Sequence, residues 1–336
     1  MIELQWCNLG RPIKKLPSTI SVDLATGTTE SLYTRLSAQT GLSRDRLRLT
    51  KGSDGSVVTV KKDSGKDVTV EELGLRNGSM IYVKDLGSQI GWRTVFVIEY
   101  LGPLVLHPLV FFLLRPYIYL NSAFNPLSYI PFLTTYNSTD AVPSPTSTQA
   151  LLCLLITLNF VKREIETLFV HRFSASTMPF SYVFRNSAHY WILCGINMSI
   201  FLYIPAASTA ASWWPKALLP ENNAMITYAA VAVWVFAQVS NFVTHMTLRG
   251  LRPEGSKKRA IPTGYGFDSV TCPNYSFEVL SWIAITVLSG GNWSAWVFTA
   301  VGGFTMMRWA QKKERRYRKE FGSAYRKKKV MIPGVL

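Results

Sequence analysis

The stretch TVFVIEYLGPLVLHPLVFFLL, residues 94–114, decides the fold class of this chain. Crossing the hydrocarbon core of a bilayer takes about 20 consecutive, mainly apolar residues, and here Glu99 is the only acidic or basic interruption apart from one histidine. The candidate span at 149–170 is apolar only to Val161, so the sequence leaves open whether a seventh or broken helix lies within 149–190. We predict an α-helical polytopic membrane protein with six or seven transmembrane helices. Its remaining candidate spans are residues 149–170, 189–207, 224–246, 275–289 and 293–310.

Composition agrees with a membrane protein. Of the 336 residues, 48% are hydrophobic and only 17% are charged, whereas a soluble domain carries about 25% charged residues. This excludes a disordered chain and argues against a wholly soluble one. The four cysteines are scattered without a CxxC spacing, so the sequence predicts neither a metal site nor a disulfide framework.

The net charge of +16 follows the pattern of a membrane topology. Loop 116–150 has no lysine or arginine, and loop 201–223 has only Lys216, whereas the alternate loops and the tail after Arg308 are strongly basic. Since basic loops stay in the cytosol, we expect both termini there. No signal peptide follows Met1, which favours the endoplasmic reticulum membrane. We expect membrane lipids, and no nucleic acid, beside the basic tail.

Residues 1–88 differ in composition from the rest. Short alternating segments at 2–7, 19–24, 46–50, 56–61 and 80–83 predict strands, and 29–40 predicts a helix with Thr28 or Thr29 as N-cap and Gly41 after its end. This order resembles the ubiquitin-like β-grasp fold. We therefore predict a cytosolic ubiquitin-like domain over 1–88, acting as a docking or stabilising module. A transmembrane catalytic domain with a basic cytosolic tail follows over 89–336.

Ionisable and amide side chains inside the spans collect toward the predicted cytosolic side. Such groups are costly in a bilayer and are functional candidates by default. They predict one polar chamber open to the cytosol, beneath the basic loop that contains Arg249, Arg252, Lys258 and Arg259. Charge alone leaves two functions open for that loop, which are binding a phosphorylated cofactor or coenzyme A ester and anchoring to the membrane surface.

Several long motifs resemble one family. VKREIETLFVHRF at 161–173, NFVTHMTLRGLRPEGSKKRAIP at 241–262 and CPNYSFEVLSW at 272–282 resemble the very-long-chain trans-2-enoyl-CoA reductases of the steroid 5α-reductase superfamily, which also carry a ubiquitin-like module. The resemblance implies reduction of a trans-2-enoyl-CoA to a saturated acyl-CoA with NADPH. That reaction is the last step of fatty-acid elongation in the endoplasmic reticulum and supplies sphingolipids. The implied partners are elongase, ketoacyl reductase and dehydratase.

The reaction also suggests roles for the catalytic candidates. Hydride adds to Cβ of the thioester, and a proton must reach Cα. Tyr275, which keeps its proton at neutral pH, is the predicted donor; its alternative role is that of an interfacial aromatic residue. Glu99 aligns with a glutamate that steroid reductases use near the substrate carbonyl, or it pairs with a base. Lys162, Arg163 and Glu166 are expected to order the site or bind phosphates, or to form an internal salt bridge at a helix end, since Lys162 and Glu166 are spaced i,i+4.

The cofactor residues are carried over from the resemblance. His245 departs from the aspartate that steroid reductases usually have, and Lys258 is included because it belongs to the basic loop. Three rivals stay open: a steroid or polyprenol reductase of the same superfamily, a more distant methyltransferase with a similar C-terminal membrane fold that would need S-adenosylmethionine, and a non-enzymatic membrane-tethered adaptor. The full predicted set is Asn241, His245, Arg249, Arg252, Lys258, Arg259, Asn274, Glu278 and Tyr317.

Overall fold

The computed structural model divides into two compact units, each of which is described by itself. The first comprises Met1–Thr94, Phe173–Tyr182 and Arg252–Lys258, and the second comprises Val95–Arg172, Val183–Leu251 and Arg259–Leu336. The structure describes residues 1–24, 26–60, 66–121, 136–137, 142–173, 176–205, 214–252 and 260–334.

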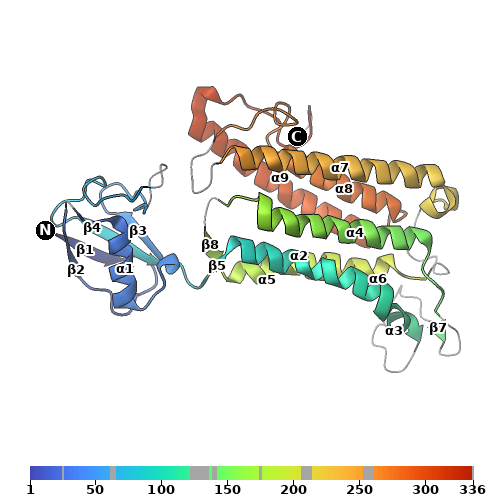
Figure 1. Cartoon of the computed structure of the whole chain (residues 1–336), viewed down its shortest axis with the longest axis horizontal. Coiled ribbons are helices and arrows are strands. Elements are labelled where there is room, and N and C mark those ends of the chain that lie inside the picture. Colours follow the sequence, from blue (N-terminus) through green and yellow to red (C-terminus); the bar gives the residue numbers. More distant parts are fainter. Residues whose placement is uncertain are drawn as a thin grey trace. The chain divides into compact units, whose positions relative to one another are not determined.

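The first unit is built on a four-stranded sheet packed against helix α1 (Figure 1). The strand order is β2-β1-β4-β3, in which β1 and β4 are parallel and the other pairs are antiparallel. Alternate residues of each strand face inward, as the period of two requires, and Leu4, Ile81 and Val83 are fully buried with Leu32 of the helix. The elements are β1 (Ile2–Asn8), β2 (Thr19–Val22), α1 (Thr29–Thr40), β3 (Leu47–Lys51) and β4 (Met80–Asp85).

The predicted helix 29–40 is confirmed with its caps. The Thr28 side chain accepts a hydrogen bond from the Ser31 backbone N–H, and Gly41 adopts the left-handed conformation with φ of 70°. The strand predicted over 56–61 is wrong for its described part. A turn after β3 returns the chain to the sheet edge, where Val57 forms an isolated bridge with Thr50. Two backbone hydrogen bonds flank this bridge, Lys51 N–H to Ser56 and Val58 N–H to Leu49, and the described pairing with β3 ends there.

The structure also has two short strand pairs and several short helical turns. The first pair joins β5 (Gln89–Gly91) with β8 (Thr177–Pro179) in antiparallel register within the first unit. A second short pair, β6 (Leu120–Asn121) and β7 (Tyr136–Asn137), is parallel. Four 3-10 turns are described, namely η1 (Arg44–Arg46), η7 (Lys216–Leu218), η8 (Pro220–Asn222) and η9 (Gly322–Ala324).

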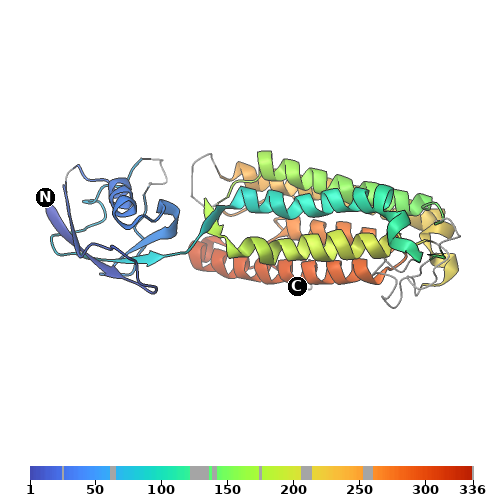
Figure 2. The ribbon, with the colours of Figure 1, turned by 90° about the horizontal axis from the view of Figure 1, so that it is seen from below.

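The second unit is helical, and its long helices run side by side (Figures 1 and 2). Each of the six predicted apolar segments falls on a helix, and the third ends at Leu202. The second helix starts before the predicted Gln149, because Thr146 and Gln149 form a capping box. The elements are α2 (Trp92–Pro108), π-helix η2 (Leu109–Leu114), α3 (Arg115–Tyr119), α4 (Ser147–Ile165), π-helix η4 (Glu166–Val170), α5 (Ser181–Ser187), π-helix η5 (Ala188–Met198), α6 (Ser199–Leu202), α7 (Ala224–Gly250), α8 (Pro273–Leu288) and α9 (Trp293–Phe321).

Two helical segments of the described residues are long and apolar enough to cross a bilayer, Trp92–Tyr119 and Ala224–Gly250. Large apolar side chains also point outward from other helices, including Phe169 and Phe184, each 68% exposed. Water does not usually face such side chains in a monomeric soluble protein over a large area. The number of spans remains a prediction.

Aromatic side chains fill the interior of the helical unit. The rings of Trp282 and Phe298 lie 4.6 Å apart, and those of Tyr100 and Tyr190 lie 5.0 Å apart, both edge to face. Gly102 lets α2 approach η5 closely, since a Cβ there would lie 2.6 Å from the Trp191 ring. This close packing holds the polar side chains of α2, α4, α7 and α8 at defined positions.

Candidate active site

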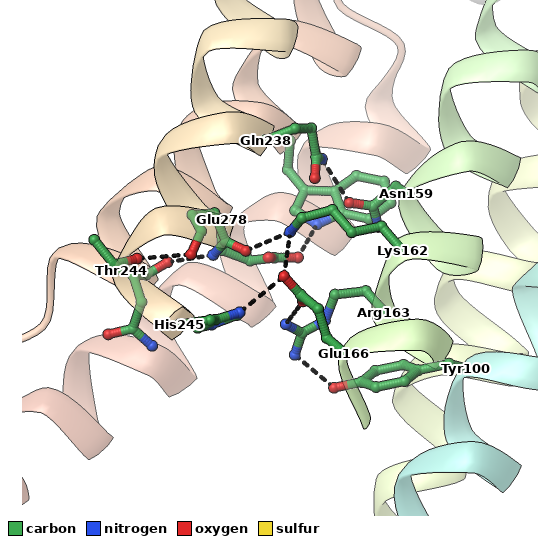
Figure 3. Close-up of polar contacts among 12 residues, drawn as sticks. Tyr100, Asn159, Lys162, Arg163, Glu166, Gln238, Thr244, His245 and Glu278 are labelled. Atoms are coloured by element: carbon green, nitrogen blue, oxygen red, sulfur yellow. Dashed lines mark hydrogen bonds and ion pairs between the residues drawn. The ribbon is translucent and has the colours of Figure 1, made fainter. Parts of the chain in front are cut away.

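Glu166 is the centre of a buried ion cluster in the helical unit (Figure 3). Its side chain is fully buried. One carboxylate oxygen lies 3.0 Å from the Lys162 ammonium and 3.1 Å from His245 Nδ1, and the other lies 3.0 Å from the Arg163 guanidinium. A buried carboxylate needs such partners, because an unpaired charge is strongly disfavoured away from water.

Local helix geometry brings these three groups of the KRExE motif together. Lys162 and Arg163 precede Glu166 by one turn, as the i,i+4 and i,i+3 spacing predicts. At Glu166 the helix widens into η4, where the His171 backbone N–H donates to the Glu166 carbonyl at 2.7 Å. Such π-helical turns are often found at functional sites.

Hydrogen bonds extend the cluster across three helices. The Lys162 ammonium donates to Asn241 Oδ1 of α7 at 2.6 Å. Asn241 Nδ2 in turn donates to the backbone carbonyl of Asn274 in the first turn of α8, at 2.8 Å. The cofactor candidates Asn241, His245 and Asn274 therefore lie against the catalytic candidates Lys162 and Glu166.

The other side of the cluster reaches α2. Arg163 donates to the Tyr100 hydroxyl at 2.7 Å, and its guanidinium lies 5.0 Å from the centroid of that ring. Glu99, the neighbour of Tyr100, is 1% exposed and interacts with the Asn186 side chain. One Glu99 oxygen has no hydrogen-bond partner among the described residues, so Glu99 is buried beside the cluster but is not joined to Glu166.

An amide pair next to Lys162 is absent from the residues predicted from the sequence. Gln238 Nε2 donates to Asn159 Oδ1 at 2.6 Å (Figure 3). Among the described residues the remaining atoms of the pair, Asn159 Nδ2 and Gln238 Oε1, have no partner, although both side chains are buried. The sequence feature that could have indicated this pair is an amide within each of two apolar runs. Asn159 stands three residues before Lys162, and Gln238 stands three residues before Asn241.

The Tyr275 side chain contacts residues of α9. Its ring lies 6.4 Å from the Trp309 ring and 4.8 Å from the Lys313 ammonium, both on α9. Cys272, just before α8, is 1% exposed, and burial raises the pKa of its thiol to about 11. At neutral pH it therefore stays a thiol and is not an activated nucleophile.

The remaining cofactor candidates are spread along the chain. Glu278 accepts a hydrogen bond from the Trp282 indole at 3.1 Å and acts electrostatically on Lys162 and Arg163. Arg249 is half-buried in the last turn of α7, and Tyr317 contacts the rings of Phe321 and Tyr325 near the end of α9. Arg252 belongs to the first unit. Lys258 and Arg259 lie outside the described residues.

One group has the spacing of metal ligands. Single donor atoms of Glu166, His171 and His245 all lie within 4.8 Å of one another. However, both oxygens of this carboxylate already contact the cations Lys162 and Arg163. A divalent cation placed there would be repelled by both side chains, so the geometry favours an ion-paired carboxylate over a metal ligand.

Comparisons with known proteins identify the family. A family model described as 3-oxo-5-alpha-steroid 4-dehydrogenase matches residues 176–336. A Schizosaccharomyces pombe protein assigned as an enoyl reductase is 41% identical over 324 residues, which cover 96% of each chain. The very-long-chain enoyl-CoA reductase of Dictyostelium discoideum is 36% identical over 325 residues, again covering 96% of each chain. The chain therefore belongs to the very-long-chain enoyl-CoA reductases of the steroid 5α-reductase superfamily.

Proposed function

We propose that this oxidoreductase uses NADPH to reduce very-long-chain trans-2-enoyl-CoA to saturated acyl-CoA. The reaction would be the last step of fatty-acid elongation in the endoplasmic reticulum membrane and would supply acyl chains for sphingolipids. Elongase, ketoacyl reductase and dehydratase are the proposed partners. The observation that carries the proposal is the buried Lys162–Glu166–His245 cluster, built from two of the motifs that resemble the family.

A nicotinamide cofactor fits the polar atoms around this cluster. Asn274 Oδ1 is buried and has no hydrogen-bond partner among the described residues, and it lies next to the Lys162–Asn241 contact. An unpaired buried acceptor is destabilising unless something binds it. Asn241, His245, Asn274 and Glu278 would hold the cofactor, with Arg249 on the phosphate side. Arg252, Arg259 and Tyr317, which the resemblance implies, and Lys258 of the basic loop complete the proposed set.

The bound nicotinamide supplies the hydride, and the protein supplies the proton and the electrostatic field. Hydride addition at Cβ leaves negative charge on Cα and the thioester oxygen. Lys162 and Arg163 provide positive charge for this developing anion. Tyr275 is the proposed proton donor to Cα. Glu99, buried with one oxygen free of partners in the described structure, is the alternative donor.

The test is NADPH oxidation by purified, detergent-solubilised protein with a long trans-2-enoyl-CoA. We expect turnover by the wild type and a loss of about 10²- to 10⁴-fold in Tyr275→Phe, the range a general acid contributes, with NADPH binding retained. Full activity in Tyr275→Phe would move the donor role to Glu99. No turnover by folded, NADPH-binding wild type would favour a steroid or polyprenol substrate instead.

The adaptor alternative makes the opposite prediction for the same variants. A membrane-tethered adaptor would complement a cell lacking the protein even after Glu99→Gln and Tyr275→Phe. The proposed 1–88 ubiquitin-like domain is supported by the sheet order β2-β1-β4-β3 with its parallel central pair. This domain and the transmembrane domain over 89–336 remain compatible with either function, so enzyme assay and complementation must be combined.

The proposed orientation has a separate test. Asn137-Ser138-Thr139 is a glycosylation sequon in the first proposed lumenal loop, and Asn77-Gly78-Ser79 lies on the proposed cytosolic side. In microsomes we expect any glycosidase-sensitive form to disappear in Asn137→Gln and to persist in Asn77→Gln. Glycosylation traced to Asn77 would overturn the orientation.

A further inference from the structure

Two adjacent lysines of α9 have different surroundings. Lys312 is exposed, whereas Lys313 is half-buried with its ammonium 4.8 Å from the centroid of the Tyr275 ring. Trp309, one turn earlier on the same face, also contacts that ring. The face of α9 that carries residues 309 and 313 therefore packs on the first turn of α8, where Tyr275 lies.

Lys313 has no carboxylate partner among the described residues. The nearest acid along the helix, Glu314, is buried and accepts hydrogen bonds from the hydroxyls of Thr271 and Tyr325. The titratable groups that face Lys313 are Tyr275 and Cys272 from the α8 side and Tyr317 from its own helix. A half-buried ammonium thus faces a phenol where a carboxylate would be usual.

This ammonium keeps its charge at neutral pH. Burial alone would lower the pKa of Lys313, but its interactions with neighbouring groups, the largest of them with Tyr275, outweigh burial and raise this pKa above its ordinary value. Cys272 remains a neutral thiol, because burial raises its pKa to about 11. The positive charge is therefore available to Tyr275 throughout the physiological pH range.

We propose that Lys313 is the positioning residue for proton transfer by Tyr275. Its ammonium orients the phenol and stabilises the tyrosinate that proton transfer leaves behind. This inference rests on the proposed function, in which Tyr275 protonates the substrate. Tyr275 itself packs against the small apolar cluster of Cys272, Ala310 and Met331.

Hydride transfer would break a C–H bond of the reduced nicotinamide, which would be oxidised to NADP⁺, and would form a C–H bond at Cβ of the enoyl thioester, which would be reduced. The π electrons of the Cα=Cβ bond would move toward Cα and the thioester oxygen. A C–H bond then forms at Cα while the O–H bond of Tyr275 breaks. The tyrosinate carries the negative charge beside Lys313 until a proton from water restores the phenol.

Matched lysine variants of the full-length protein test this role. In the NADPH oxidation assay we expect Lys313→Met to lower kcat about 10- to 100-fold, less than loss of the whole general acid, with KM for NADPH and enoyl-CoA nearly unchanged. Lys312→Met should stay within about twofold of the wild type. Lys313→Arg, which retains a cation, should recover part of the rate, and Lys313→Met should have no further effect in a Tyr275→Phe background.

A readout without cofactor or substrate separates a chemical role from a structural one. The ionisation of Tyr275 can be followed as the ultraviolet difference titration between each protein and its Tyr275→Phe counterpart. We expect this ionisation to move to higher pH in Lys313→Met and to stay in place in Lys312→Met. An unchanged titration, or equal rates for the two lysine variants, would overturn the role of Lys313.

The outcomes also distinguish this inference from the proposed function. If wild-type protein binds NADPH but does not reduce enoyl-CoA, the proposed function fails and the role of Lys313 fails with it. If the wild type is active and Lys313→Met slows Tyr275→Phe as strongly as it slows the wild type, only the role of Lys313 fails. Lower thermal stability of Lys313→Met with an unchanged rate per folded molecule would likewise contradict it.

Discussion

The helical unit contains two buried polar regions near opposite ends of α4, and they use their hydrogen bonds differently. The ion cluster around Glu166 lies at the C-terminal end, where side chains bond mostly to one another (Figure 3). The second region, which we call the carbonyl-capping cluster, surrounds Gln149 at the N-terminal end. At 1.5 Å per residue, Gln149 and Lys162 are about 20 Å apart along the helix.

The carbonyl-capping cluster directs its side chains to five successive backbone carbonyls at the end of α6. A helix end leaves such carbonyls without partners, and burial would make this costly. His107 adds a bond to the Tyr203 hydroxyl at 2.7 Å. In these hydrogen bonds Tyr119 donates to the carbonyl of Ile200, Asn292 to that of Phe201, Gln149 to those of Leu202 and Ile204, and Arg115 to that of Tyr203.

The difference suggests a division of roles. In the carbonyl-capping cluster Tyr119, Asn292, Gln149 and Arg115 each donate to backbone carbonyls, so this region stabilises the fold. Around Glu166, amide atoms of Asn159, Gln238 and Asn274 lack partners in the described structure. Those atoms are what a bound molecule would use. The comparison can be tested by asking which substitutions reduce stability and which reduce activity.

Glu166→Gln should have the largest effect. It removes the anion that Lys162, Arg163 and His245 share, and removing one partner of a buried ion pair typically costs about 3–5 kcal/mol. We expect a lower thermal unfolding temperature in detergent and loss of NADPH oxidation together. The control Lys162→Met/Glu166→Leu removes both charges of one pair and should be more stable than Glu166→Gln. Wild-type stability and activity in Glu166→Gln would contradict the central place of this cluster.

Gln149→Leu should come next and should affect stability alone. It removes the donor to the Leu202 and Ile204 carbonyls as well as part of the capping box, for a loss of about 2–3 kcal/mol. Thermal unfolding should therefore shift downward, while kcat and KM per folded molecule stay at the wild-type values. A change in KM for NADPH at unchanged stability would remove the distinction between the two regions.

Variants of the Asn159–Gln238 pair test whether polar side chains near Glu166 serve activity rather than stability. Asn159→Leu should cost about 1–2 kcal/mol, because the amide of Gln238 loses its buried partner. Asn159→Leu/Gln238→Leu should recover most of that stability, since replacing both partners by apolar groups is nearly neutral. We expect the double variant to stay impaired in NADPH oxidation. Recovery of both stability and activity would make the pair structural.

The smallest effect concerns an ion pair outside the helical unit. A hydrogen bond from Arg46, 2.6 Å from Asp85, holds the pKa of that carboxyl below its ordinary value of 3.8. A lowered folded-state pKa stabilises the fold above pH 3.8, and this contribution is lost as the pH falls through the lowered value. The side chains are partly exposed, so we expect about 0.5 kcal/mol.

Pulse proteolysis of the full chain in urea can measure this pair. Cleavage within residues 1–88 should become easier as the pH is lowered from 5 to about 3, and Arg46→Gln should reduce that pH dependence. Arg48→Gln, a substitution two residues away on exposed β3 surface, is the matched control and should leave the pH dependence unchanged. Equal profiles for both variants would show that the pair does not contribute.

Local sequence patterns predicted much of the fold and part of the site. The helix over 29–40 and the positions of the long helices follow from capping residues and apolar runs. The Lys162–Glu166 pair follows from i,i+4 spacing. The strand predicted over 56–61 is wrong although Val57 is exposed and Val58 is buried, as in a strand. The described pairing with β3 consists of one bridge at Val57, too short to count as a strand.

Other contacts depend on residues far apart in the chain. Lys313 belongs to a run of basic residues that the sequence indicates as a cytosolic tail, and nothing local separates it from Lys312. Asn159 and Gln238 are 79 positions apart, and each is an isolated polar residue in an apolar run. Arg252 is close to Arg249 in sequence, yet the two belong to different units.

The sequence by itself determined which segments are helices and strands, because periodicity, caps and apolar length act within a few neighbouring residues. It also determined the family, through long ordered motifs. Only the tertiary structure decided that Glu166 meets His245, that Tyr275 meets Lys313, and that Gln149 caps the end of α6. Those contacts depend on how close-packed helices are rotated against one another, and that rotation is set by the sum of many side-chain contacts rather than by any local pattern.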